Sequence, residues 1–307
     1  MSENKSVNRL FLITVVIYIG VSFLTGALIP PEVPIYVHLM ISQALIIVPV
    51  LIYCKIQGIK LRELIPFRKM KISTTVLVIV CTYLIYPLLI VCNVFSLFWT
   101  QSQTVDVLSA MGGENLALNG IMMAAIPAMV EEMMFRGVIY QTYRRTRVFT
   151  GALLSAFLFG CMHMNFNQFI YTFVFGIYLA LLVEATGSIF SSMLAHFTLN
   201  FTSVLMLFIV TKISPAVAGA GAIPGNFTGT MDAASLGMLL MGVFLLACIA
   251  LGTTAGAVGV YIGLSTTAGR YEYVKQMFKK HKEERMISIA LVVAIIIAFA
   301  MMLFIEL

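Results

Sequence analysis

Polar and ionisable side chains interrupt three otherwise apolar segments of the chain. They are Glu131, Glu132 and Arg136 in the first segment, His163 in the second, and His196 and Asn200 in the third. Ionisable residues are costly in hydrocarbon and are therefore rare in membrane segments unless they serve a function. A carboxylate and an imidazole can deprotonate a water molecule, while a second imidazole and a carboxamide can donate hydrogen bonds to an oxyanion. Together these groups would suit the hydrolysis of an amide bond.

The first segment reads IPAMVEEMMFRGVIY and separates Glu132 from Arg136 by four residues. On a helix this spacing brings the carboxylate to the guanidinium, and we interpret the pair as a buried ion pair that fixes packing. Glu131 points about 100° away around the helix and has no cation of its own. A carboxylate in that position must be protonated or contact water, which suits a general base. Pro127, one turn upstream, can loosen the backbone and admit that water.

The two histidine segments repeat the same four-residue spacing. Phe159 and His163 share one helix face, as do His196 and Asn200. A single membrane histidine is often a packing residue, but the second histidine beside an asparagine favours a functional interpretation. Zinc is the alternative, with Glu131, His163 and His196 as ligands. We expect no cofactor, because the His-Glu-x-x-His spacing is absent, and no serine nucleophile, because the sequence lacks GxSxG.

Composition indicates the elements that must position these residues. The chain of 307 residues is 61% hydrophobic and 10% charged, with a mean hydropathy of +1.01, far from the roughly 25% charged residues of soluble domains. We expect an all-α polytopic membrane bundle that forms one integral membrane domain over residues 1–307. All five cysteines lie in apolar segments without paired spacing, so we predict neither disulfides nor a thiolate metal site.

Nine apolar runs are long enough to consider as spans. They are Leu10–Ile29, Tyr36–Ile56, Ile72–Phe98, Leu118–Tyr140, Gly151–His163, Gln168–Glu184, Ser188–Val210, Ala234–Leu264 and Met286–Phe304. The short fifth run and the long, glycine-rich eighth run could be broken, tilted or re-entrant, which leaves eight spans as an alternative.

Basic residues predict the orientation. With the amino terminus in the cytoplasm, nine spans place every Lys and Arg on the inner side except Lys212 and the membrane residue Arg136. Because these cations are spread over short connections, we expect no nucleic-acid partner. The outer connections contain Glu32, Asp106 and Glu114, followed by the segment 214–230, which we interpret as a linker rather than a lid. Glu184 closes the sixth span at the inner face, where a helix cap is a more common role than catalysis.

The three motifs resemble those of the CPBP family of intramembrane endopeptidases, the CAAX protease and bacteriocin-processing family, also called Abi. Glu131-Glu132-x-x-x-Arg136 is similar to its EExxxR, Phe159-x-x-x-His163 to its FxxxH, and His196-x-x-x-Asn200 to its HxxxN. The turn that begins at Glu184 also resembles a family sequence. The similarity covers residues 118–211, which would form the catalytic core, with accessory spans in residues 1–117 and 212–307.

The resemblance implies roles for these residues. Glu131 and His163 would activate water, and His196 with Asn200 would stabilise the oxyanion. The supporting residues would be Glu132, Arg136, Phe159 and Glu184. Eukaryotic members trim prenylated proteins, and bacterial relatives are linked to peptide processing, bacteriocin immunity or protein sorting. The compact chain with basic flanks looks more bacterial than eukaryotic, so we expect a multi-pass protein of the bacterial cytoplasmic membrane.

We therefore expect an intramembrane endopeptidase whose substrate is a hydrophobic or lipidated, CAAX-like peptide or protein in the bilayer. Its cavity would open toward the cytoplasmic side or laterally to lipid. Two alternatives remain open at this point. One is a proton- or ion-coupled transporter, because carboxylates and histidines in spans also form proton relays. The other is a non-catalytic immunity or scaffold protein that keeps the polar cluster for packing.

Overall fold

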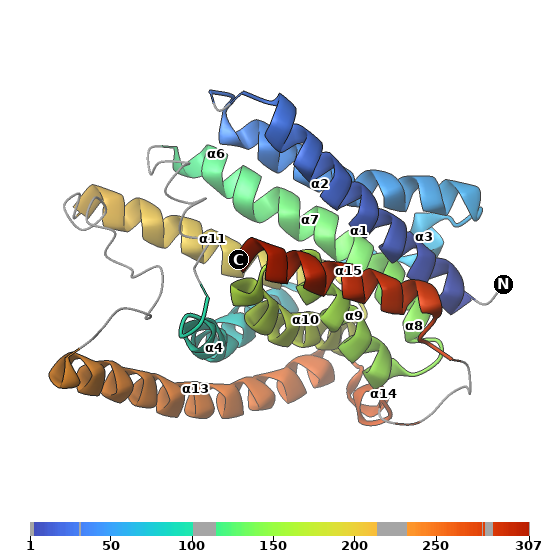
Figure 1. Cartoon of the computed structure of the whole chain (residues 1–307). Coiled ribbons are helices and arrows are strands. Elements are labelled where there is room, and N and C mark those ends of the chain that lie inside the picture. Colours follow the sequence, from blue (N-terminus) through green and yellow to red (C-terminus); the bar gives the residue numbers. More distant parts are fainter. Residues whose placement is uncertain are drawn as a thin grey trace.

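The chain folds into a bundle of long apolar helices (Figure 1). The computed structural model describes residues 3–30, 32–100, 115–213, 232–277, 279 and 285–306, and every regular element in these ranges is helical. Eight of the helices described there are long and apolar enough to cross a membrane. This protein is therefore a multi-pass, all-α membrane protein, as its composition predicts.

Seven of the eight spans are single α-helices. They are α1 (Glu3–Leu28), α2 (Ile35–Ile56), α4 (Ile72–Ser96), α10 (Phe166–Thr186), α11 (Ile189–Ile213), α13 (Ala233–Thr267) and α15 (Ile289–Glu306). The eighth span runs continuously through Leu116–Tyr143. It consists of α6 (Leu116–Gly120), η1 (Ile121–Ala125), α7 (Ile126–Glu132), η2 (Met133–Ile139) and α8 (Tyr140–Tyr143), where the two η segments are π-helical.

The predicted fifth span is too short to cross a membrane. Helix α9 (Val148–Met162) has 15 residues, which extend about 22 Å and do not cover a hydrocarbon core of about 30 Å. Helix α13 is unbroken, so the glycine-rich eighth run is not re-entrant. Two short helices that the apolar pattern did not predict, α3 (Leu61–Leu64) and α14 (Tyr271–Lys275), lie in the basic connections. The predicted linker 214–230 lies outside the described residues, as do Asp106 and Glu114.

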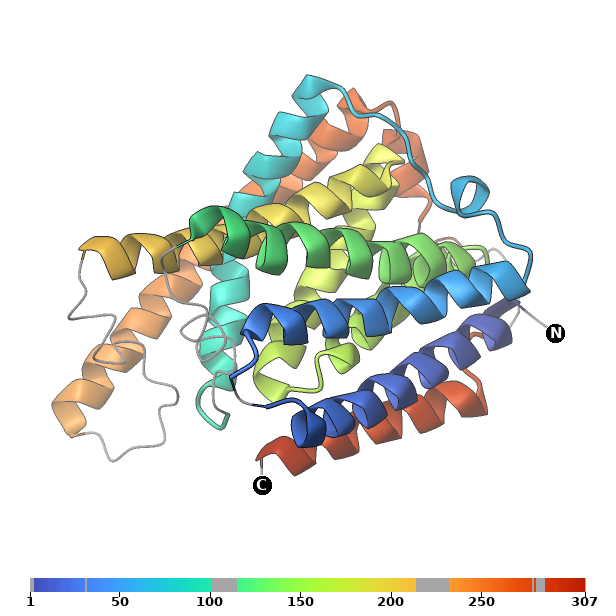
Figure 2. The ribbon, with the colours of Figure 1, turned by 90° about the horizontal axis from the view of Figure 1, so that it is seen from above.

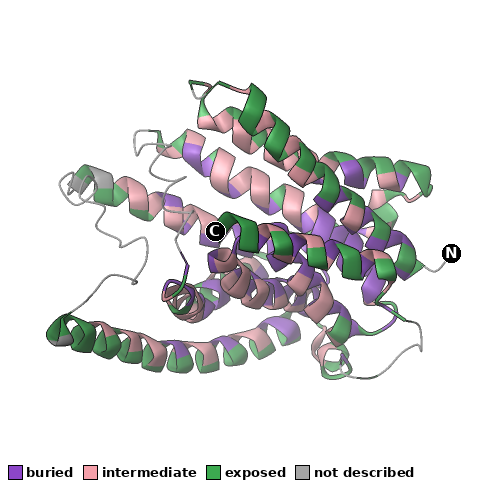
Figure 3. Ribbon diagram, viewed as in Figure 1, coloured by how far each residue is buried: buried purple, intermediate pink, exposed green. Residues whose placement is uncertain are grey.

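The span that contains the glutamates occupies the middle of the bundle. Its segments α7 and η2 contact both α2 and α11, while α1 pairs with α15 and α4 pairs with α13 toward the periphery (Figure 2). All residues from Met134 to Tyr143 are buried, whereas much of α13 is exposed on its outer side (Figure 3). Exposed apolar faces of this kind are the surface that a bilayer covers.

Most of the basic residues gather at one end of the bundle, which we call the basic end. It is formed by the start of α1 and the connections that contain residues 57–71, 144–147, 187–188 and 268–277. Contacts join these segments: Arg145 pairs with Glu3 at 2.6 Å, the Ile189 amide donates to the Pro66 carbonyl at 3.0 Å, and the Arg270 Nε donates to the Glu184 carbonyl at 2.6 Å.

Local sequence signals explain where the helices near the motifs begin and end. The side chain of Asn165 caps α10 by accepting from the Gln168 amide at 2.9 Å. Gly187 ends the same helix with φ of 69°, a left-handed conformation that glycine adopts without steric cost. Helices α9 and α10 are thereby fixed as a tight hairpin whose turn carries His163.

Candidate active site

One cavity of about 690 Å³ lies among α2, α4, α11, the α9–α10 hairpin and the central span. Glu131, His163, His196 and Asn200 all line it. These are the four residues for which the sequence predicts a shared site, although they come from three separate motifs. The remaining lining is mostly apolar, with amide side chains from Gln43, Asn93 and Gln168.

Glu132 lies behind the cavity in a buried ion pair. Its Oε1 accepts from the Arg136 guanidinium at 2.7 Å, and both side chains are 0% exposed. The same oxygen accepts from His196 Nδ1 at 3.1 Å. The predicted pairing of Glu132 with Arg136 is therefore present, and it also fixes the orientation of the His196 ring.

Two further contacts hold the Arg136 guanidinium. It donates to the Gly176 carbonyl of α10 at 3.1 Å, and its centre lies 4.4 Å above the ring of Phe159. Gly176 is required for this approach, because a Cβ there would lie 2.9 Å from the Cα of Ala156 and 3.0 Å from the guanidinium. Phe159, a predicted supporting residue, thus contacts the Glu132–Arg136 ion pair through a cation–π interaction with Arg136.

Glu131 is held far more loosely than its neighbour. Its side chain is 13% exposed, and its Oε2 lies 3.9 Å from His196 Nε2. Its other oxygen accepts a long hydrogen bond of 3.4 Å from Gln43 of α2. The two adjacent carboxylates therefore occupy different surroundings, as their angular separation predicts: one in a dry ion pair, the other at the cavity wall.

His163 follows the last residue of α9 and lies in the turn of the α9–α10 hairpin. Its Nδ1 lies 2.9 Å from the Phe159 carbonyl, and since a carbonyl only accepts, Nδ1 must carry the proton. In the neutral ring, Nε2 then bears the lone pair. The next residue, Met164, has a φ of 51°, an unfavourable conformation for a non-glycine residue that the Asn165 cap helps to impose. The turn thereby fixes the position of His163.

The ring of His196 is enclosed by aromatic side chains. It meets Phe159 edge-on at 5.8 Å and Phe175 at 5.6 Å, both measured between ring centroids. These contacts and the Nδ1 bond to Glu132 leave Nε2 as the nitrogen on the side of Glu131.

Asn200 is positioned through a defect in the central helix. In an α-helix the carbonyl of Met123 would accept from residue 127, but Pro127 has no N–H to donate. The Asn200 carboxamide donates to this carbonyl instead, at 3.1 Å. The π-helical segments η1 and η2 lie on either side of α7, and such segments are frequent at functional sites. One of the two amide protons of Asn200 remains for a ligand.

Gln43 is a site residue that motif reasoning missed. It lies in α2, outside the three motifs, and contacts Glu131 directly. Its Oε1 is buried without a hydrogen-bond partner. The sequence did contain a signal, because Gln43 is a carboxamide within the apolar run ISQALIIVPV, and polar residues in membrane segments tend to face functional cavities.

Glu184 lies at the basic end and does not line the cavity. It is 1% exposed, and Arg144 binds it with both ends of its guanidinium fork, at 2.7 and 2.9 Å. Tyr140 donates to it at 2.7 Å, and Arg270 binds its carbonyl. These contacts connect α10 to the central span and to the corner between α13 and α14, so Glu184 holds helices together rather than contacting the cavity.

We expected the cavity to open toward the cytoplasmic side or laterally to lipid, and its lining extends away from the basic end. The lining residues reach Met122 near the start of the central span, Val210 near the end of α11, and Leu97 just beyond α4. All three of these places lie at the end of the bundle opposite the basic end. His163 lies at the end of α9 away from the basic connections, Glu131 and Asn200 lie near the middle of their spans, and His196 lies in the half of α11 nearer the basic end.

Across the described residues, no three His, Cys, Asp or Glu side chains are grouped as metal ligands, whereas a catalytic zinc needs three protein ligands at about 2 Å.

Comparison with known proteins agrees with the motifs. Residues 113–202 match the family described as type II CAAX prenyl endopeptidase Rce1-like. No curated protein and no solved structure matches the chain. The matched segment covers less than a third of the chain, but it contains all three motifs and three of the elements that line the cavity. Through this segment the match supports the resemblance to the CPBP/CAAX protease family.

Proposed function

We propose that this protein hydrolyses a peptide bond of a hydrophobic or lipidated, CAAX-like substrate inside the cavity, with Glu131 as the general base. The observation that carries the proposal is the convergence of Glu131, His163, His196 and Asn200 on one cavity. The family match also favours a protease. This broad assignment does not depend on which residue plays which role.

In this mechanism a water molecule lies between Glu131 and His163. The carboxylate of Glu131 accepts one proton of the water as the oxygen attacks the scissile carbonyl, while the Nε2 lone pair of His163 accepts a hydrogen bond from the other O–H. The C–N bond then breaks, and the proton passes to the departing amine. One water is consumed, and the products are a carboxylic acid and an amine.

His196 and Asn200 stabilise the oxyanion of the tetrahedral intermediate. Asn200 offers its remaining amide proton. Because His196 Nδ1 donates to Glu132, its Nε2 can donate only when the ring carries both protons. Donors fixed in a site from which water is largely excluded stabilise developing charge most effectively.

Glu132 and Arg136 act as positioning residues in this scheme. They fix the ring of His196 and the packing of α10 against the central span. We further propose that no resident metal takes part, since the three prospective ligands are not grouped as a zinc site.

Cleavage of a fluorogenic hydrophobic peptide by the purified protein in detergent tests the proposal. Glu131→Gln should abolish cleavage, while the matched control Glu63→Gln, at an exposed ion pair with Lys60, should cleave like the wild type. Undiminished cleavage by folded Glu131→Gln would refute the role of this residue. Proton-driven solute uptake into proteoliposomes without cleavage would favour a transporter. Elemental analysis that finds stoichiometric zinc, lost together with activity on chelation, would refute the metal-free mechanism.

A further inference from the structure

The basic end identifies which side of the membrane the bundle presents to the cytoplasm. Up to Lys275, every Lys and Arg apart from Arg136 and Lys212 belongs to the first two turns of α1, the last turn of α2 or the basic connections, and the remaining four follow in the sequence between Lys279 and Arg285. Connections rich in Lys and Arg remain in the cytoplasm. A bundle with this distribution is inserted with its basic end inward.

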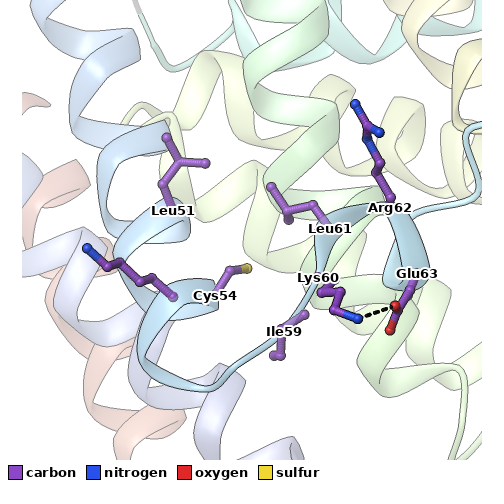
Figure 4. A pocket seen from close by; sticks show the side chains of 8 residues that line it. Leu51, Cys54, Ile59, Lys60, Leu61, Arg62 and Glu63 are labelled. Atoms are coloured by element: carbon purple, nitrogen blue, oxygen red, sulfur yellow. Dashed lines mark hydrogen bonds and ion pairs between the residues drawn. The ribbon is translucent and has the colours of Figure 1, made fainter.

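A groove lined by charged and apolar residues lies at the basic end, where α2 leads into α3 (Figure 4). Lys60 and Arg62 border it together with Glu63, and Lys60 pairs with Glu63 at 2.9 Å. Exposed cations beside the apolar residues Leu51 and Leu61 suit an interface with anionic cytoplasmic lipid headgroups. The groove thus supports the same orientation as the count of basic residues.

The cavity extends in the opposite direction. Its lining on the central span runs from Phe135 to Met122, a rise of about 20 Å along the helix. On α11 the lining runs from His196 to Val210, three residues before the helix ends. Met122 and Val210 both lie near the end of the bundle that faces away from the basic connections.

The central span closes the cavity toward the basic end. The ten residues Met134–Tyr143 are all buried, and the Glu132–Arg136 pair fills the space directly behind His196. Nearer the basic end, Tyr140 and Arg144 of the central span and its following connection bind Glu184 at the end of α10. A peptide approaching the cavity from the cytoplasm along the central span would therefore meet the buried Glu132–Arg136 pair.

From these observations we propose that the substrate enters the cavity from the extracytoplasmic half of the membrane. This inference rests on the proposed protease function. The lining is suited to an apolar peptide segment, because Leu89, Ile90 and Leu207 offer apolar contacts and Gln168 and Asn200 can hydrogen-bond a peptide backbone. The substrate class is thus a hydrophobic peptide exposed at the outer leaflet rather than a lipidated chain held at the inner one.

Cysteine labelling tests the direction of access without requiring catalysis. Ser203→Cys lies on the cavity wall, Val210→Cys lies nearer the outer end with 39% exposure, and Lys60→Cys is the matched control, 77% exposed at the basic end. Each is made in a chain whose five native cysteines are changed to alanine. A membrane-impermeant maleimide is applied to intact bacterial cells and to inverted membrane vesicles.

We expect the maleimide to modify Ser203→Cys and Val210→Cys in intact cells, and Lys60→Cys in inverted vesicles alone. An added decapeptide of leucine and alanine should slow the modification of Ser203→Cys severalfold. Modification of the two cavity variants only in inverted vesicles, or only by a membrane-permeant maleimide, would overturn the proposal. Neither result would affect the protease assignment, which the loss of cleavage in Glu131→Gln tests separately.

Discussion

Neutralising Glu132 should destabilise the protein, whereas the same change at Glu131 should leave its stability nearly intact. Glu132→Gln removes the carboxylate that faces a guanidinium at 2.7 Å, with both groups 0% exposed. The Arg136 charge would lose its counter-charge and keep only neutral partners, namely the amide oxygen of the new glutamine, the Gly176 carbonyl and the Phe159 ring. Breaking a buried pair by removing one partner costs about 3–5 kcal/mol.

The contacts of Glu131 are weaker. Its hydrogen bond to Gln43 is 3.4 Å long, and its distance to His196 is 3.9 Å. Replacement by glutamine retains the shape and a hydrogen-bonding oxygen, so the loss should stay below about 1 kcal/mol. At about 2 °C per kcal/mol for a chain of this size, Glu132→Gln should lower Tm by about 6–10 °C and Glu131→Gln by less than about 2 °C.

Thermal unfolding in detergent can be followed with a thiol-reactive dye, because Cys54, Cys81 and Cys161 are free and buried. The double variant Glu132→Gln with Arg136→Met removes the unpaired charge and should regain part of the lost Tm. Equal Tm values for the two single glutamine variants would refute the division into a structural and a cavity carboxylate. So would a double variant no more stable than Glu132→Gln.

Three further changes test other parts of the site. Gly176→Ala should destabilise by about 1–3 kcal/mol, because its Cβ would lie 2.9 Å from Ala156; an unchanged Tm would contradict the close packing of α9 on α10. Asn200→Ala should lower kcat about 10²–10³-fold with little change in KM, and a change in KM alone would argue for substrate binding instead. Glu184→Gln should lower stability by about 2 kcal/mol but leave kcat of the folded protein unchanged, since its contacts lie at the basic end; a large loss of kcat would contradict a purely structural role.

The helical elements were largely predictable because each depends on local sequence. Apolar runs of about 20 residues predict spans, and the i, i+4 spacing of Glu132 and Arg136 predicts the ion pair that the structure contains. The span count was harder, because α9 is apolar but has 15 residues. The division into a catalytic core and accessory spans stays a prediction.

The composition of the site was predictable only in part. Polar residues within apolar segments pointed to one cavity, but the contact between Gln43 and Glu131 joins residues 88 positions apart, and no local pattern encodes that distance. The π-helical segments around α7 were also not predicted, since Pro127 indicates a loosened backbone but not its form. The end toward which the cavity extends depends on how the helices pack, which the sequence of any one helix does not determine.

The central claim is that an activated water molecule attacks the peptide directly, with Glu131 as the base. A single turnover in H₂¹⁸O, followed by mass spectrometry of the cleaved peptide and of the protein, tests it. The account predicts one ¹⁸O atom in the new carboxylate of the product and none in Glu131. A product without ¹⁸O, together with label in the Glu131 side chain, would show a covalent acyl intermediate and contradict the account.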